Sequence, residues 1–95
     1  MAAYVIADID VNDAAKFEEY KKLSGPSGGP FGAKYLVRGG KVEGLEGAWT
    51  PKRCVVIEFP SAEQAKAWWN SEAYNAAKAI RRTCASSNFV LVEGV

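Results

Sequence analysis

Two carboxylates and two guanidinium groups fall at the ends of predicted strands, at Asp8, Asp10, Arg38 and Arg53. The topology derived below brings these strand ends to one edge of a sheet, where the four charges are expected to gather. Arginine holds a planar oxyanion through two parallel hydrogen bonds, which would suit a carboxylate ligand. An ion-pair network, either at the strand ends or across a dimer, is the commoner use of such a cluster, and we favour it over a ligand site.

Glu58 interrupts an apolar strand that begins with Cys54-Val55-Val56-Ile57. A carboxyl group buried there would have a raised pKa and would suit a general acid or base. Glu58 is therefore the candidate catalytic residue. The alternative is structural: Lys34, expected at the same end of the sheet, would neutralise the carboxylate, and perturbed groups are often of this kind.

Aromatic side chains at helical spacing form a third candidate group: Phe17, Tyr20, Trp68, Trp69 and Tyr74. They would either line a ligand pocket or fill the core, and the core is the commoner role. Because Trp68 and Trp69 are adjacent, at least one of them must leave the buried stripe and is expected to touch a pocket or a neighbour. Trp49 falls in a loop, where an exposed indole is typical of an interface anchor.

No histidine occurs among the 95 residues. The chain thus lacks the commonest general base and metal ligand, the usual haem ligand, and every Ser-His-Asp or Cys-His arrangement. We therefore expect no metal site and no cofactor. The Gly-rich segment 24–32 does not match a phosphate-binding loop, since no Gly-Lys-Ser/Thr follows at the required spacing.

Composition is that of an ordinary soluble globular domain, with 48% hydrophobic residues, 24% charged residues and a net charge of +1. Near-neutral charge without a long basic run argues against nucleic-acid and anionic-membrane partners. No segment approaches the roughly 20 apolar residues of a membrane span, and the N-terminus lacks a signal-peptide pattern. Cys54 and Cys84 are expected to be free buried thiols, which favours a cytoplasmic location.

Four apolar, β-branched segments carry strand patterns: residues 4–11, 34–38, 53–59 and 89–95. Helical spacing separates the first from the second and the third from the fourth. The order β-α-β-β-α-β predicts one domain over residues 1–95, an α+β, ferredoxin-like sandwich. Its sheet would be antiparallel, in strand order 4-1-3-2, with the helices on one face.

The first predicted helix is capped by Asn12 or Asp13 and is expected to stop near Leu23. Residues 24–32 contain four glycines and two prolines, which cannot continue a helix. We interpret this segment as a connector rather than a mobile lid.

The second predicted helix begins at Ser61, which forms a capping box with Gln64. The pair Asn70-Ser71 marks a break after which the helix restarts. The restarted helix places Ala77 and Cys84 on one apolar face.

Two predicted strands, at residues 4–9 and 54–57, are apolar on both alternating faces. Continuous apolar runs indicate a sheet that is covered on both sides. Two helices can cover only one side, so the other side requires a second subunit. The sequence therefore predicts a homodimer.

Several short segments together resemble the bacterial domain-of-unknown-function 1330 family: Tyr35-Leu36-Val37-Arg38-Gly39-Gly40, Leu45-Glu46-Gly47, Arg53 to Ser61, and Val92-Glu93-Gly94. Trp68, Ser71, Tyr74 and Arg81 add to this resemblance, which covers nearly the whole chain. It implies membership of the dimeric α/β-barrel superfamily, in which two sheets pair and the helices lie outside. Relatives there include cofactor-independent monooxygenases, muconolactone-isomerase-like enzymes and haem-binding proteins, and ligands commonly sit between sheet and helices.

The resemblance implies functional positions at Arg38, Gly39, Glu58, Ser71, Tyr74 and Arg81. It also implies a first helix that continues toward the second strand. The Gly- and Pro-rich segment 24–32 departs from that pattern. The absence of histidine argues against the haem-binding relatives.

The leading hypothesis is a homodimeric, cofactor-free domain that binds a small acidic or aromatic organic molecule. Arg38 would hold an anionic group, Glu58 would shuttle a proton, and Trp69 with Tyr74 would line the pocket. One alternative is a non-catalytic dimerisation or sensor module in which the same residues are structural. A second is a monooxygenase-like enzyme, which rests on superfamily kinship alone.

Overall fold

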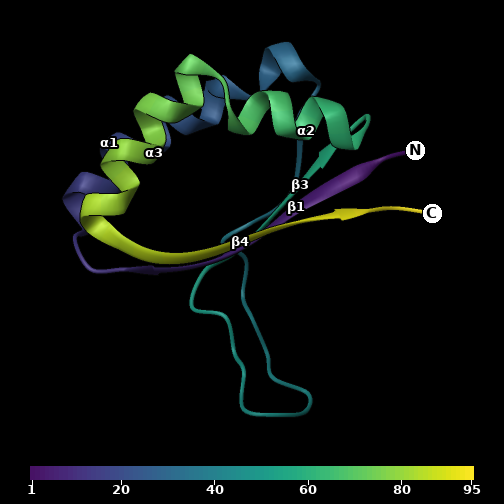
Figure 1. The fold of residues 1–95 in the computed structure, drawn as a ribbon. Helices are drawn as coiled ribbons and strands as arrows, with labels where there is room; N and C mark the ends of the chain where they lie inside the picture. The colour runs from purple at the N-terminus through teal and green to yellow at the C-terminus, as the bar shows by residue number, and fades with distance from the viewer.

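The computed structural model describes all 95 residues and contains the predicted elements in the predicted order. Three α-helices cover one face of a four-stranded sheet and leave the other face bare (Figure 1). The α+β, ferredoxin-like architecture is confirmed. The elements are β1 (Ala3–Val11), α1 (Ala14–Ser27), the 3-10 turn η1 (Gly29–Phe31), β2 (Lys34–Arg38), β3 (Cys54–Phe59), α2 (Ala62–Trp69), α3 (Glu72–Cys84) and β4 (Ala85–Glu93).

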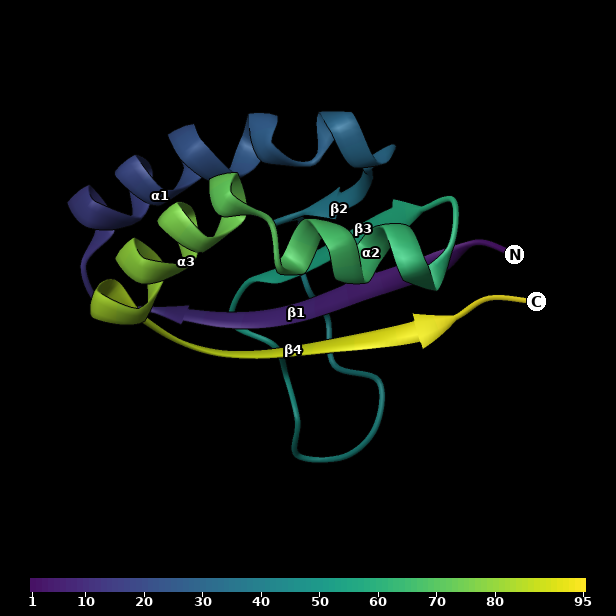
Figure 2. The ribbon, with the colours of Figure 1, turned by 45° about the horizontal axis from the view of Figure 1, so that its top comes forward.

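The sheet is antiparallel throughout, in the order β2-β3-β1-β4, as predicted. Strands β1 and β3 are central, and β2 and β4 form the edges (Figure 2). Alternation along β1 buries Val5 and Ala7 beneath the helices, while Tyr4 and Ile6 lie half-buried on the bare face.

The core lies between the helices and the inner face of the sheet. Its largest fully buried side chains are Trp68, Tyr74, Phe59 and Cys84. The ring centroids of Phe59 and Trp68 are 5.3 Å apart, and those of Trp68 and Tyr74 are 4.0 Å apart. Each such side chain contributes on the order of 1.5–3 kcal/mol by leaving water.

The helix caps agree with the sequence. Asp13 caps α1, and the Ser61 Oγ accepts a hydrogen bond from the Gln64 backbone N–H at 3.2 Å. Of the two bonds that a capping box predicts there, this is the one present. Ser71 restarts the chain as α3: its Oγ accepts from the Tyr74 N–H at 3.2 Å and donates to the Trp68 carbonyl at 2.7 Å. Trp68 and Trp69 are consecutive residues of α2, so their side chains leave the helix about 100° apart.

The prediction that the first helix ends near Leu23 is wrong, because α1 continues to Ser27 and contains Pro26. Side chains replace the backbone bonds that the last turn loses. The Ser24 carbonyl accepts from the Ser27 Oγ at 2.6 Å, and the Ser27 Oγ accepts from the Trp68 Nε1 at 2.9 Å. The segment 24–32 is therefore a helix end and a 3-10 turn packed on the core, and the expected departure from the family pattern is also wrong.

Strand β4 begins at Ala85, four residues before the predicted start at Phe89, and ends at Glu93. The polar run Ser86-Ser87-Asn88 hides this part of the strand in the sequence. It pairs with the end of β1, where Asp10 faces Ser86 and Val11 faces Ala85. Backbone pairing with β1 outweighs the low β-propensity of these polar residues.

The bare face of the sheet carries exposed apolar side chains. Val37 is 37% exposed, Val90 57% and Val92 46%. The long loop between β2 and β3 projects on this side, opposite the helices (Figures 1 and 2). Trp49 in this loop is 68% exposed, and its Nε1 donates to the Asp8 Oδ2 at 3.0 Å.

Candidate functional site

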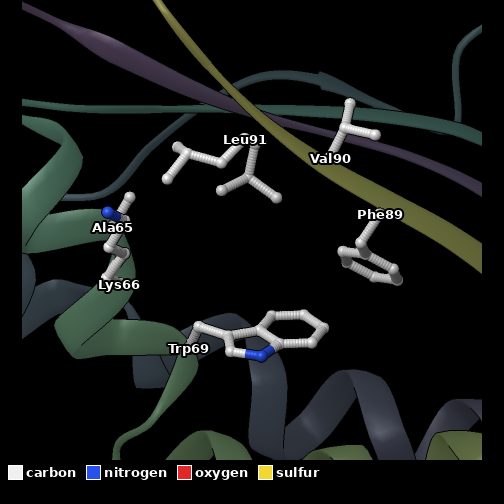
Figure 3. Close-up of a pocket in the computed structure, with 7 residues that line it drawn as sticks. Ala65, Lys66, Trp69, Phe89, Val90 and Leu91 are labelled. Atoms are coloured by element: carbon white, nitrogen blue, oxygen red, sulfur yellow. The ribbon is translucent and has the colours of Figure 1, made fainter.

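A groove of about 290 Å³ lies between α2 and the edge strand β4. Figure 3 shows the side chains from the helix and from the strand facing one another across it. This volume is close to the lower end of about 300 Å³ for small-molecule sites. Six of the seven lining residues are hydrophobic: Val5, Ala65, Lys66, Trp69, Phe89, Val90 and Leu91.

Trp69 occupies this position because α2 ends there. Its neighbour Trp68 points into the core, as the adjacency of the two residues predicted, and Trp69 turns toward β4. The Trp69 ring centroid is 5.3 Å from that of Phe89 and 5.5 Å from that of Tyr74. Tyr74 belongs to the core beneath this aromatic wall rather than to the lining of the groove.

A second hollow of about 310 Å³ lies on the other side of the Trp69–Phe89 pair. It is more polar, because the end of α3 contributes Arg81 and Arg82 and the early part of β4 contributes Ser87. Trp69 and Phe89 line both hollows and so form their common wall. An apolar hollow and a basic hollow thus lie next to one another.

Arg81 is buried, with 5% of its surface exposed. Its guanidinium carbon lies 4.3 Å from the Phe89 ring centroid and 5.9 Å from that of Tyr20. No carboxylate lies within 4.0 Å of it, since the only ion pair of the chain joins Lys21 to Glu18. The Arg81 Nε and the Ser87 Oγ are buried without a hydrogen-bond partner. Native structures rarely leave buried polar groups in this state, so these two need an explanation.

Two buried tyrosines lie beside the arginine. The hydroxyl oxygens of Tyr20 and Tyr74 are 2.8 Å apart and share a hydrogen bond. Burial, reinforced by the neighbouring Tyr20, raises the pKa of Tyr74 above its ordinary value, and Arg81 only partly opposes this shift. The Tyr74 hydroxyl is therefore neutral at ordinary pH.

Lys78 strengthens the positive charge of this region. Its Nζ donates to the Trp69 carbonyl at 2.9 Å and lies 3.8 Å from the Trp69 ring centroid. Burial, followed by repulsion from Arg82 and Arg81, lowers the pKa of Lys78. The bond to Trp69 ties α3 to the end of α2 and helps to fix the indole that separates the hollows.

The other predicted arginine lies elsewhere. Arg38, at the end of β2, stacks over Tyr35 with its guanidinium carbon 4.5 Å from the ring centroid. Together with Arg53 it borders a space of only about 30 Å³ between α1 and the sheet. Gly39 has a φ of 74°, and a Cβ there would collide with the Arg53 guanidinium. Gly39 thus makes room for an arginine and forms no part of the groove.

The predicted ion-pair network at the strand ends does not form within one subunit, where the one ion pair joins Lys21 to Glu18. Asp8 binds the Trp49 indole and the Lys52 backbone N–H on the bare face, the latter at 3.0 Å. Arg38 and Arg53 line the space on the helix-covered face. These residues lie at the same end of the strands but on opposite faces of the sheet, because side chains alternate along a strand. Their position in the sequence predicts the strand end but does not predict the face.

Glu58 also lies on the bare face, half-buried and paired in register with Tyr4 on one side and Lys34 on the other. It forms no ion pair with Lys34. Hydrogen bonding to Glu58 and its negative charge raise the pKa of Tyr4. Of the seven predicted site residues, Trp69, Tyr74 and Arg81 come together, Ser71 caps the helix that carries two of them, and Arg38, Gly39 and Glu58 lie outside this cluster.

The family model for DUF1330, a domain of unknown function, matches residues 2–95. The chain belongs to the DUF1330 family. No functionally curated protein matches this DUF1330 sequence significantly. None of its helices has the length and apolar composition needed to cross a membrane.

Solved structures with the same fold have low sequence identity to this DUF1330 chain. RPA0582 of Rhodopseudomonas palustris, a protein of unknown function, is 15% identical with a TM-score of 0.81, over 99% of this chain and 82% of its own. A dimeric ferredoxin-like protein of unknown function from Bacteroides fragilis is 12% identical with a TM-score of 0.66, over 98% and 96%. SnoaB, a cofactor-independent oxygenase from Streptomyces nogalater, is 10% identical with a TM-score of 0.65, over 99% and 92%. At these identities the likeness establishes the fold alone.

Two groove residues escaped the sequence analysis. Phe89 was predicted only as the start of a strand. Because Phe89 and Leu91 are two residues apart in β4, they lie on the same face of the sheet, which is the face toward the helices. Ser87 fell before the predicted strand start, so no pattern assigned it a face. A longer β4, counted back from its pairing with β1, would have found both.

Proposed function

We propose that this DUF1330 protein is a homodimer that binds a small organic molecule in the groove of each subunit. The observation that carries the proposal is the juxtaposition of an apolar hollow, an aromatic wall and a basic hollow. Trp69 and Phe89 provide flat apolar surfaces, and they lie on a helix end and a strand that the fold holds rigidly. Such a groove, apolar with a few polar groups, has the character of a ligand site.

The dimer is proposed to form through the bare face of the sheet. Exposed Val37, Val90 and Val92 on this face, with half-buried Ile6 and Val56 between them, support the proposal because monomers rarely leave such a patch uncovered. Ferredoxin-like relatives that are dimeric give independent support. The second copy is the occupant that fits best, since an isologous contact places the same apolar patch on both subunits.

Native mass spectrometry of the freshly purified protein tests both parts of the proposal. We expect a dimer that carries additional small-molecule mass, released on denaturation for identification. Trp69→Ala should lose this mass and remain a dimer, whereas Leu23→Ala, which alters an exposed side chain of α1, should keep it. A monomer would refute the assembly, and a dimer that binds nothing before or after incubation with aromatic compounds would favour an assembly module.

Glu58, the residue predicted to transfer a proton, does not line the groove. Glu58 lies on the bare face beside Tyr4, so a reaction there requires a ligand enclosed between the two sheets of the dimer. Glu58→Gln should then abolish any turnover and leave the affinity of the groove ligand unchanged. Unchanged turnover in this variant would assign Glu58 a structural role.

A further inference from the structure

Three buried side-chain polar atoms have no hydrogen-bond partner, and two of them line one hollow and point to the chemistry of the ligand; the third is the Nε of Arg53, which lines the small space between α1 and the sheet. The Arg81 Nε and the Ser87 Oγ have no hydrogen-bond partner, and both residues line the basic hollow. Arg81 is 5% exposed, so water does not solvate its charge as it would on a surface. A buried charge is costly unless a partner of opposite sign satisfies it, and the protein itself supplies no carboxylate within 4.0 Å.

The electrostatics of the region favour an anion. Arg81, Arg82 and Lys78 lie close enough for the two arginines to lower the pKa of Lys78. The facing part of β4, Ala85 to Asn88, contains no acidic residue. Guanidinium and hydroxyl donors together match the two oxygens of a carboxylate, the guanidinium through its fork of N–H groups.

The rest of the ligand must be apolar. The adjoining hollow is lined by Ala65, Leu91 and the aliphatic stem of Lys66, and the Trp69–Phe89 wall lies between it and the arginine. Phe89 has a neighbour in each hollow. The Arg81 guanidinium carbon lies 4.3 Å from the Phe89 ring centroid, and the Trp69 ring centroid lies 5.3 Å from it. A ligand that spans both hollows over the edge of this wall would place its ring in the apolar groove and its acid group in the basic hollow that Arg81 lines.

We infer that the groove and the adjoining basic hollow together select small aromatic carboxylic acids, with the carboxylate held by Arg81 and Ser87 in the basic hollow and the ring seated against Trp69 and Phe89 in the groove. This inference rests on the proposed function, because it names the ligand class of the same groove. It moves the anion anchor from Arg38, on the edge strand β2, to Arg81, at the end of α3 beside the opposite edge strand β4. Arg38 has its guanidinium stacked on Tyr35 and borders a space too small for an aromatic acid.

The test compares 2-naphthoate with its neutral isostere 2-naphthamide by isothermal titration calorimetry on the intact protein. A charge-assisted pair should make the acid bind at least about tenfold more tightly than the amide. Ser87→Ala should reduce this preference, Arg81→Gln should abolish it, and Arg38→Gln, the matched control, should preserve it. The wild-type comparison stands even where Arg81→Gln fails to fold.

The outcomes separate the inference from the proposed function. Equal binding of acid and amide to the wild-type protein overturns acid selection and leaves groove binding intact. An acid preference that survives in a folded Arg81→Gln variant but disappears in Arg38→Gln overturns the assignment to Arg81. Absence of binding by both compounds, with no small-molecule mass on the purified dimer, overturns the ligand site itself.

Discussion

The hydroxyl pair of Tyr20 and Tyr74 joins α1 to α3 and provides a quantitative test of the packing. The two oxygens are 2.8 Å apart, and the residues are 6% and 0% exposed. Tyr74→Phe keeps the ring and leaves the Tyr20 hydroxyl buried without this partner. An unsatisfied buried donor costs about 1–3 kcal/mol, so we expect the free energy of unfolding to fall by that amount. Tyr20→Phe should have a similar effect.

Replacing both tyrosines removes both hydroxyls and leaves neither without a partner. The double variant should therefore lose less stability than the two single variants together, with a coupling energy of about 1 kcal/mol or more. Urea denaturation monitored by circular dichroism, at one fixed protein concentration, measures the loss in free energy of unfolding for the two single variants and the double variant. Tyr35→Phe is the control, because its hydroxyl makes only a long contact of 3.4 Å to Ser24. Additive losses for Tyr20 and Tyr74 would refute a direct bond between them.

Three further predictions use the same denaturation assay or a mass measurement. Gly39→Ala should lower the free energy of unfolding by about 1–3 kcal/mol, because the φ of 74° at Gly39 is unfavourable for a residue with a Cβ and the Arg53 guanidinium would also have to move; Gly40→Ala, in open space, should be neutral. Val92→Glu places a charge on the proposed interface, so light scattering should show a monomer. Ala76→Glu, on the exposed side of α3, is the control and should remain a dimer. A dimeric Val92→Glu variant would contradict the proposed interface. The pKa of Tyr74 in the folded protein is raised above 10.0, so the contribution of Tyr74 to stability is present below about pH 10 and is lost as the pH rises further. Tyr74→Phe should therefore flatten the decline of the free energy of unfolding at alkaline pH. An unchanged decline in this variant would refute the assignment of the decline to Tyr74.

The order and pairing of the strands could be predicted because the sequence signals them locally. Alternating apolar residues define β1 and β3, and the handed, short connections of a split β-α-β unit leave one strand order. The caps at Asp13, Ser61 and Ser71 were visible for the same reason, since each bond joins residues three apart. Local information was sufficient for these features.

The errors arose where distant contacts override local preference. Pro26 and its neighbouring glycines predict the end of a helix, yet Trp68, 41 residues away, donates a hydrogen bond to Ser27 and holds that turn in place. The polar start of β4 is a strand only because the end of β1 pairs with it. Neither partner can be identified from the residues around the error, because both lie far along the chain.

The candidate site was partly predictable for a related reason. The adjacency of Trp68 and Trp69 required one indole to leave the core, and Trp69, which was predicted to line the pocket, is the one that borders the groove. The charged residues were harder to place. Their position along a strand fixes the edge, but only the register fixes the face, and a shift of one residue exchanges the two faces.

The buried face of α3 shows why Arg81 is better explained by a ligand than by packing. A helix that only covers a sheet needs apolar residues on this face, as Ala77 and Cys84 provide. Lys78 is buried there too, but its ammonium group is satisfied by the Trp69 carbonyl, so its role in joining the helices is complete within the chain. Arg81 has aromatic neighbours and no acceptor for its Nε, and the Ser87 hydroxyl beside the same hollow also lacks a partner. An acceptor group that reaches both would satisfy the Arg81 Nε and the Ser87 Oγ together, and a carboxylate has two oxygens with which to accept from them.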